Sequence, residues 1–284
     1  MKTKPFTGRA RHFRRRMAMA GQAVCRESGR AVRPTNKSVF ICVYPWLISQ
    51  TVRFLLASEF RILNSSVVPK WIKFIIAILL LPFCAGAAKA LWLVLRASYG
   101  ADTVWVPLLA GAVCWVVIYA LLPKPMWVYV FGHELTHVIW TWLSGGRVKK
   151  MKVTSNGGHV ITSKTNFLVV LAPYFFPLYA ALVITVFAIG HLILGWKNYL
   201  VWFHLVVGTA YAFHVTLTWH VLKTRQSDVT SQGYLFSAVI IFLGNVGILL
   251  FGVPLLTAKV SLFNALGWWL ESTGGIFQGL ARWF

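Results

Sequence analysis

Residues 126–143 have the sequence MWVYVFGHELTHVIWTWL, an apolar run interrupted by the polar group His133-Glu134-Leu135-Thr136-His137. The run is nearly as long as the roughly 20 apolar residues that a helix needs to cross a bilayer. A carboxylate inside such a run is costly, and ionisable residues in membrane segments usually serve a function. This stretch therefore predicts that the protein is embedded in a membrane and that its functional residues lie within this segment.

Five more apolar runs surround this segment, at about 72–95, 103–122, 167–194, 199–222 and 234–256. Of the 284 residues, 58% are hydrophobic and 12% are charged, whereas soluble domains carry about 25% charged residues. We therefore expect an all-α polytopic membrane protein with about six transmembrane helices, whose membrane domain covers residues 67–260.

The loop between the third and fourth runs has a different pattern. Residues 148–153 alternate at the period of a strand, Asn156-Gly157-Gly158 is typical of a turn, and residues 159–162 are again β-prone. This pattern predicts a small β-hairpin. Basic residues are frequent in the loop and acids are absent, so the positive-inside rule places it in the cytoplasm; the basic residues are Arg147, Lys149, Lys150, Lys152 and Lys164.

The two ends of the chain differ from this domain. Residues 1–66 are basic, with a weak apolar segment at 39–60. We expect this region to be disordered, and a native product that starts further along the chain is an alternative. Residues 261–284 mix tryptophans with polar residues and glycines, which favours an interfacial amphipathic tail. The net charge of +22 fits a lipid bilayer as partner rather than nucleic acid, because most basic residues outside residues 1–37 lie between apolar runs.

The pentapeptide at 133–137 is typical of a metal site. His133 and His137 are four residues apart, so on a helix they share a face and can bind one tetrahedral ion. Glu134 can then accept a proton from metal-bound water. From composition, about 0.003 such pentapeptides are expected by chance. The structural alternative is a set of polar side chains that only hydrogen-bond to neighbouring helices.

A catalytic zinc site needs a third protein ligand. The carboxylates downstream of the motif are Asp228 and Glu271. Asp228 is favoured because it follows the fifth run on the predicted cytoplasmic side, where the hairpin also lies. His214 and His220, in the fifth run, are alternative ligands, and His159 in the hairpin is a weaker one. A loop aspartate that pairs with an arginine or caps a helix is the structural alternative for Asp228.

These features together resemble the site-2 protease family of intramembrane zinc metalloproteases, over roughly residues 126–245. The similarity begins at residues 132–137 and continues through Leu143-Ser144-Gly145-Gly146-Arg147-Val148 into the hairpin. It includes Leu171-Ala172-Pro173 before the next span, and Ser227-Asp228 where the family supplies its aspartate. Two departures are Thr136, where the family usually has glycine, and the absence of a glycine after Asp228.

The resemblance implies one Zn²⁺ per chain, with His133, His137 and Asp228 as ligands and Glu134 as catalytic base. It also implies cleavage of membrane-protein substrates, in a bacterial inner membrane with the site facing the cytoplasm. A CaaX-type protease would need a downstream glutamate ligand, for which only Glu271 is present. A non-catalytic membrane protein, such as a transporter-like or assembly factor, is an alternative, as is hydrolysis of a non-peptide bond. The oligomeric state is not indicated.

Overall fold

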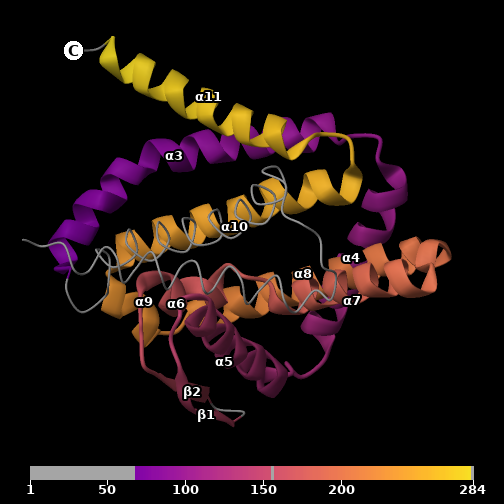
Figure 1. The fold of residues 1–284 in the computed structure, drawn as a ribbon, viewed down its shortest axis with the longest axis horizontal. Coiled ribbons are helices and arrows are strands. Elements are labelled where there is room, and N and C mark those ends of the chain that lie inside the picture. The colour runs from indigo at the N-terminus through magenta and orange to yellow at the C-terminus, as the bar shows by residue number, and fades with distance from the viewer. Residues whose placement is uncertain (1–67, 155–156, 283–284) are drawn as a thin grey trace, which may run out of the picture. The chain divides into compact units, whose positions relative to one another are not determined.

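The computed structural model describes residues 68–154 and 157–282, and the predicted disorder of residues 1–66 lies outside this range. Helices dominate the described part, with one two-stranded antiparallel sheet beside them (Figure 1). The elements, labelled as in Figure 1, are α3 Lys70–Ala97, α4 Asp102–Leu121, α5 Met126–Leu143, β1 Val148–Thr154, β2 Gly157–Thr162, α6 Phe167–Leu171, η1 Ala172–Tyr174, α7 Leu178–Leu194, η2 Trp196–Tyr199, α8 Leu200–Leu222, α9 Ser227–Gln232, α10 Tyr234–Thr257 and α11 Leu262–Ala281.

Several helices have the length and composition of membrane spans. By those two criteria four segments of the described chain qualify, and they contain α3, α4, α8 and α10. The pair formed by 167–174 and α7 would make a fifth if it is one bent span. The predicted apolar runs thus correspond closely to helices, while the predicted count of six spans stays a prediction.

The segment expected as one run at 167–194 is broken. The chain bends by 83° between Phe167–Tyr174 and Leu178–Leu194. Pro173 lies in the 3₁₀ turn η1, and Pro177 is the N-cap residue of α7. Proline lacks an N–H and disrupts a helix interior but is well accepted at a helix start. The two prolines therefore allow α6, η1 and α7 to form as separate pieces.

α4 and α8 pack closely and run parallel. Thr209 Oγ1 donates to the Gly111 carbonyl at 3.0 Å, and further along both helices Trp115 Nε1 donates to Thr216 Oγ1 at 2.8 Å. A Cβ at Gly111 would overlap the Leu205 carbonyl oxygen, and one at Gly208 would overlap that of Leu108. Small residues that admit the partner backbone are typical of helix pairs in membranes.

This parallel arrangement corrects the expectation that α5 is the third of six alternating spans. α7 and α8 are antiparallel, since Tyr179 meets Phe213 and Phe187 stacks on Phe203. The segment between α4 and α7 therefore begins and ends at one end of the bundle. Accordingly, Met126 packs in the same cluster as Val221 at the end of α8. In Figure 1, α5 slants away from the nearly horizontal α10.

The opposite boundary of α5 lies at this same end. Ser144 Oγ accepts from Asn166 Nδ2 at 3.2 Å, and the next residue, Phe167, packs edge-on against Phe236 near the start of α10. α5 is also less apolar than the spans, because His133, Glu134 and His137 interrupt it. We call the end of the bundle that holds α9 the site end.

α11 forms a helix where an interfacial tail was expected. It runs antiparallel to α3, as shown by Ala265 in one cluster with Val94 and by Phe277 against Phe83, with ring centroids 5.8 Å apart. α3 itself starts at the site end, where Lys73 Nζ donates to Gln232 Oε1 of α9 at 2.6 Å. α11 thus returns towards the site end, and its interfacial location stays a prediction.

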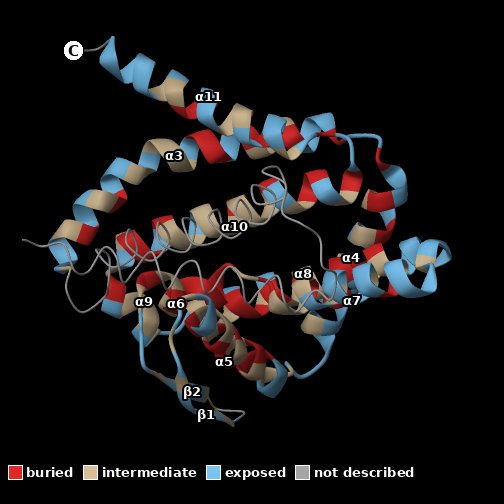
Figure 2. Cartoon of the chain, in the orientation of Figure 1, coloured by how far each residue is buried: buried red, intermediate tan, exposed pale blue. Residues whose placement is uncertain are grey.

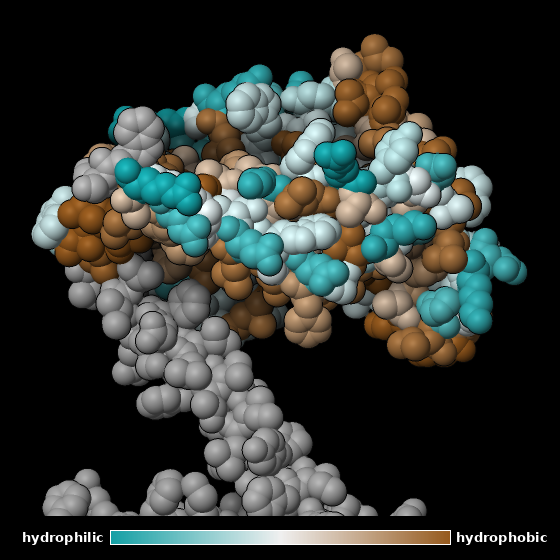
Figure 3. Space-filling view, turned by 90° about the horizontal axis from the view of Figure 1, so that it is seen from above, coloured by the Kyte–Doolittle hydropathy of each residue, from teal (hydrophilic) through white to brown (hydrophobic). Residues whose placement is uncertain are grey.

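Burial is concentrated around α5, α6 and η1, while the outer part of α7 and much of α11 are exposed (Figure 2). Many large apolar side chains are exposed on the spans, among them Trp92, Leu109 and Phe251. Figure 3 shows such apolar side chains beside hydrophilic ones on one molecular face. Exposed apolar surface of this extent is expected where lipid takes the place of water.

Candidate metal centre

α5 presents the two histidines of the motif on one face. The centroids of the His133 and His137 rings are 4.9 Å apart and the ring planes meet at 78°. The i, i+4 spacing brings two side chains this close on one helix face. Gly132, just before the first histidine, lies directly against the Tyr179 ring, where a Cβ would come within 2.7 Å. Thr136 stands where a glycine is usual in the resembling family. Its hydroxyl donates to the Gly132 carbonyl at 2.8 Å, so this polar group is satisfied within α5 itself.

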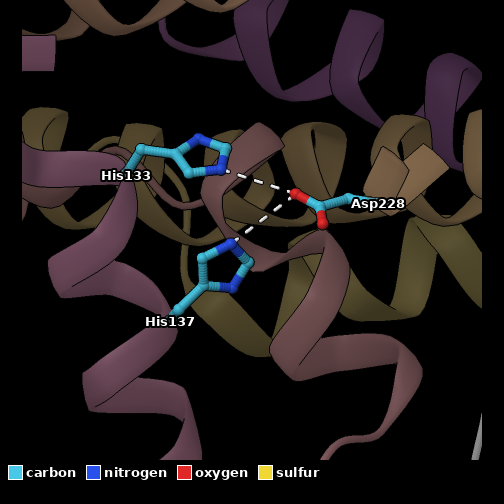
Figure 4. A group of neighbouring side chains, drawn as sticks. All are labelled: His133, His137 and Asp228. Carbon is cyan, nitrogen blue, oxygen red and sulfur yellow. Dashed lines mark ion pairs between the residues drawn. The ribbon is translucent and has the colours of Figure 1, made fainter. Parts of the chain in front are cut away.

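α9 supplies the carboxylate. This short helix follows α8, and Asp228 lies in its first turn. Asp228 Oδ2 is 3.5 Å from His133 Nε2 and 3.6 Å from His137 Nε2, so one oxygen faces both rings (Figure 4). The sequence prediction that Asp228, rather than another downstream residue, comes near the two histidines agrees with this geometry.

The three side chains fit a zinc ion in donor type and spacing. One ligand atom from each of the three residues lies within 4.8 Å of the other two. Ligand atoms bound tetrahedrally to zinc at about 2.0–2.1 Å are about 3.3 Å apart, close to both distances from Asp228 Oδ2. Imidazole nitrogen and carboxylate oxygen are both common zinc ligands.

His137 is also fixed in the orientation that a ligand requires. Its Nδ1 lies 2.7 Å from the Val169 carbonyl oxygen, so Nδ1 carries the proton and donates. Nε2 is then left with a free lone pair towards Asp228. Metal-binding histidines usually have a second hydrogen bond of this kind, which fixes tautomer and ring orientation.

The Asp228 carboxyl lies outside the candidate spans, and its pKa reflects its neighbours. Burial alone raises the pKa of this carboxyl. The neighbouring side chains of His133 and His137 outweigh burial and hold the pKa well below its usual range. Asp228 is therefore a carboxylate at neutral pH, which is the form that binds a cation.

Glu134 shares a cavity with the three residues. This cavity of about 440 Å³ is lined by His133, Glu134, His137 and Asp228 and by hairpin residues including Gly158. Glu134 is only 5% exposed. The hairpin therefore covers the acid that the sequence predicts as the catalytic base.

None of the alternative ligands belongs to the cluster of three. Among the described residues, the only cluster of three potential ligands is His133, His137 and Asp228. His214 is buried in α8 and lines a second, small cavity beside His133, while His159 lines the large one. His220 is half-buried near the end of α8, and Glu271 is exposed on α11.

One neighbour of the centre was not identified from the sequence. Tyr174 donates from its hydroxyl to Asp228 Oδ2 at 3.1 Å, and its ring packs edge-on against His133. It directly follows the segment 171–173 that the sequence analysis used. A tyrosine in an apolar run carries no local signal for such a contact.

Comparison with known proteins gives one family match. Residues 105–227 match the family described as Peptidase M50B-like. The match contains most of α4 and the histidines and glutamate of α5, and ends one residue before Asp228. It confirms the resemblance to the site-2 protease family. No curated protein and no solved structure matches the chain.

Proposed function

We propose that this chain, in which residues 105–227 are Peptidase M50B-like, is an intramembrane zinc metalloprotease that cleaves membrane-protein substrates in or near their transmembrane segments. His133, His137 and Asp228 would hold one zinc ion, and Glu134 would be the catalytic base.

One observation carries this proposal. Three potential ligands from two separate elements, α5 and α9, converge within 4.8 Å in the wall of a cavity that Glu134 also lines. A purely structural polar cluster needs neither a third converging ligand nor a buried carboxylate beside it, because a buried unpaired carboxylate is expensive.

The chain's own residues account for proton transfer. Zinc, when bound, would polarise the scissile carbonyl and lower the pKa of its water to about 7. Glu134 would accept the proton of the attacking water and pass it to the leaving amine. Its burial favours this role, since a base works best where water cannot compete for the proton.

The hairpin would hold the substrate. β2 residues Gly158, His159 and Val160 line the cavity, so an extended segment beside the sheet would lie next to Glu134. A helical substrate hides its carbonyl groups in backbone hydrogen bonds and must unwind before attack. Adding a strand to a sheet edge compensates for the hydrogen bonds that are lost.

The orientation of the site belongs to the proposal as well. Residues 147–164 at the site end carry five basic residues and no acid, which favours the cytoplasmic side of a bacterial inner membrane. A catalytically silent protein that keeps this fold is the competing function, and Glu134 is the residue that discriminates between them.

The test combines metal content with proteolysis. Detergent-purified wild type should hold about one zinc per chain by elemental analysis. Asp228→Ala should lose most of it, whereas Asp102→Ala, which removes an exposed carboxylate at the start of α4, should not. Glu134→Gln should keep zinc.

Cells expressing wild type should accumulate new peptide termini in membrane proteins, detected by mass spectrometry, and cells expressing Glu134→Gln should not. Zinc in wild type without new termini would favour a non-catalytic protein that keeps this fold. No zinc in wild type would remove the metal centre altogether.

A further inference from the structure

We infer that Tyr174 is a positioning residue of the metal centre, whose hydroxyl holds the ligand oxygen of Asp228 in place. The inference rests on the proposed metal site, which it deepens by adding a group outside the ligand set.

Tyr174 contacts two of the three proposed ligands at once. Its hydroxyl donates to Asp228 Oδ2 at 3.1 Å, the same oxygen that faces His133 and His137. Its ring lies edge-on to the His133 ring, with centroids 5.3 Å apart at 85°. Among the described residues, the side chains that approach this oxygen are Tyr174, His133 and His137.

Asp228 depends on such a hydrogen bond more than the two histidines do. Its side chain is 28% exposed, compared with 12% for His133 and 14% for His137. It lies on a helix of six residues, preceded by an exposed stretch at 223–225. Gln232 ties the last turn of α9 to Lys73, whereas Asp228 lies in the first turn, next to this exposed stretch.

Tyr174, in contrast, is held rigidly. It is 1% exposed and lies in η1, the 3₁₀ turn at the bend that precedes α7. Asn245 of α10 donates to the Tyr174 carbonyl at 3.1 Å, which ties the turn to a neighbouring helix. The phenol therefore projects from a buried turn towards a more exposed carboxylate.

A hydrogen bond to a ligand oxygen orients that oxygen before metal binds. Removing such a partner typically weakens metal affinity by about 10–100-fold. Tyr174→Phe removes the hydroxyl and keeps the ring, so the packing against His133 stays intact.

Tyr179→Phe is the matched control. Tyr179 is also a tyrosine next to α5, and its hydroxyl donates at 2.6 Å to the carbonyl of Val128, which is not a ligand. Both variants lose one phenol hydrogen bond, but only Tyr174→Phe loses one at the metal centre.

The experiment measures zinc affinity by chelator competition in detergent, and the visible spectrum of the Co²⁺-loaded proteins. We expect Tyr174→Phe to bind zinc about 10–100-fold more weakly and to shift the Co²⁺ bands. Tyr179→Phe should match wild type in both measurements.

Three results would overturn the inference. Unchanged affinity in Tyr174→Phe, even with lost turnover, would assign the hydroxyl to the reacting substrate while the metal centre stands. Equal weakening in both variants would point to general destabilisation. Absence of metal in wild type would remove the proposed function itself.

Discussion

Gly158 of the hairpin lies directly on Glu134 of α5: a Cβ at position 158 would come 2.6 Å from Glu134 Cγ and 2.7 Å from Oε1. The two residues belong to separate elements, and their contact joins the hairpin to the proposed base. Only a residue without a side chain permits this approach.

Gly158→Ala should therefore impair catalysis while sparing the metal ligands. The added methyl must displace either Glu134 or β2, and a misplacement of about 1 Å can cost about 100-fold in rate. Zinc content should stay at the wild-type level, and cleavage of the substrates found with wild type should fall by about that factor. Gly247→Ala, at a helical glycine with open space around it, is the control. Full activity in Gly158→Ala would show that the hairpin does not constrain Glu134.

Asn166 should support His137 through α6. Asn166 Oδ1 accepts from the Val169 N–H at 2.8 Å as the cap of α6, and the Val169 carbonyl accepts from His137 Nδ1. Asn166→Ala should cost about 1 kcal/mol of stability, as loss of a cap does, and should also weaken zinc binding by about tenfold. Chelator competition and thermal unfolding measure the two effects.

Ser261→Ala is the matched control for this prediction. Ser261 caps α11 in the same way, since its hydroxyl accepts from the Asn264 N–H at 3.1 Å, but it does not contact the metal centre. Similar loss of stability with unchanged zinc affinity is expected. If both variants bind zinc equally well, the Asn166 cap has no role in orienting His137.

Gly208 should be essential for the pairing of α4 with α8. A Cβ there would overlap the Leu108 carbonyl oxygen, and backbone cannot move aside as a flexible side chain can. Gly208→Ala should destabilise the protein by about 1–3 kcal/mol, measured as a lower thermal midpoint in detergent. Gly252→Ala, where nothing lies within 4 Å, should leave the midpoint nearly unchanged. An unaltered midpoint in Gly208→Ala would contradict the close packing of these helices.

The direction of α11 predicts the side of the membrane on which Arg282 lies. α11 is antiparallel to α3, and α3 begins at the site end, so residues near Arg282 should lie on the same side of the membrane as the hairpin loop. Single cysteines at Lys164→Cys and Arg282→Cys, in a cysteine-free background, should react with an impermeant maleimide from one side. Lys197→Cys, between α7 and α8, should react from the other. Labelling of Arg282→Cys together with Lys197→Cys would mean that α11 does not return.

The sequence by itself determined the features that depend on neighbouring residues. Apolar runs predicted α3, α4, α5, α8 and α10 to within a few residues, because helix length and hydropathy are properties of a continuous segment. Alternation around Asn156-Gly157-Gly158 predicted the hairpin, which the structure forms from Val148–Thr154 and Gly157–Thr162. The i, i+4 spacing alone placed His133 and His137 on one face of a helix.

Only the tertiary structure decided how separate segments meet. The sequence could not distinguish a bent pair from one span at 167–194, nor reveal that α4 and α8 are parallel, so it predicted α5 as a crossing. Nor could it identify Tyr174 beside Asp228, because long-range contacts between helices depend on packing and not on local pattern. The choice of Asp228 over Glu271 rested on membrane sidedness. The structure brings Asp228 to the two histidines because α9 follows α8 at the end of the bundle where α5 lies.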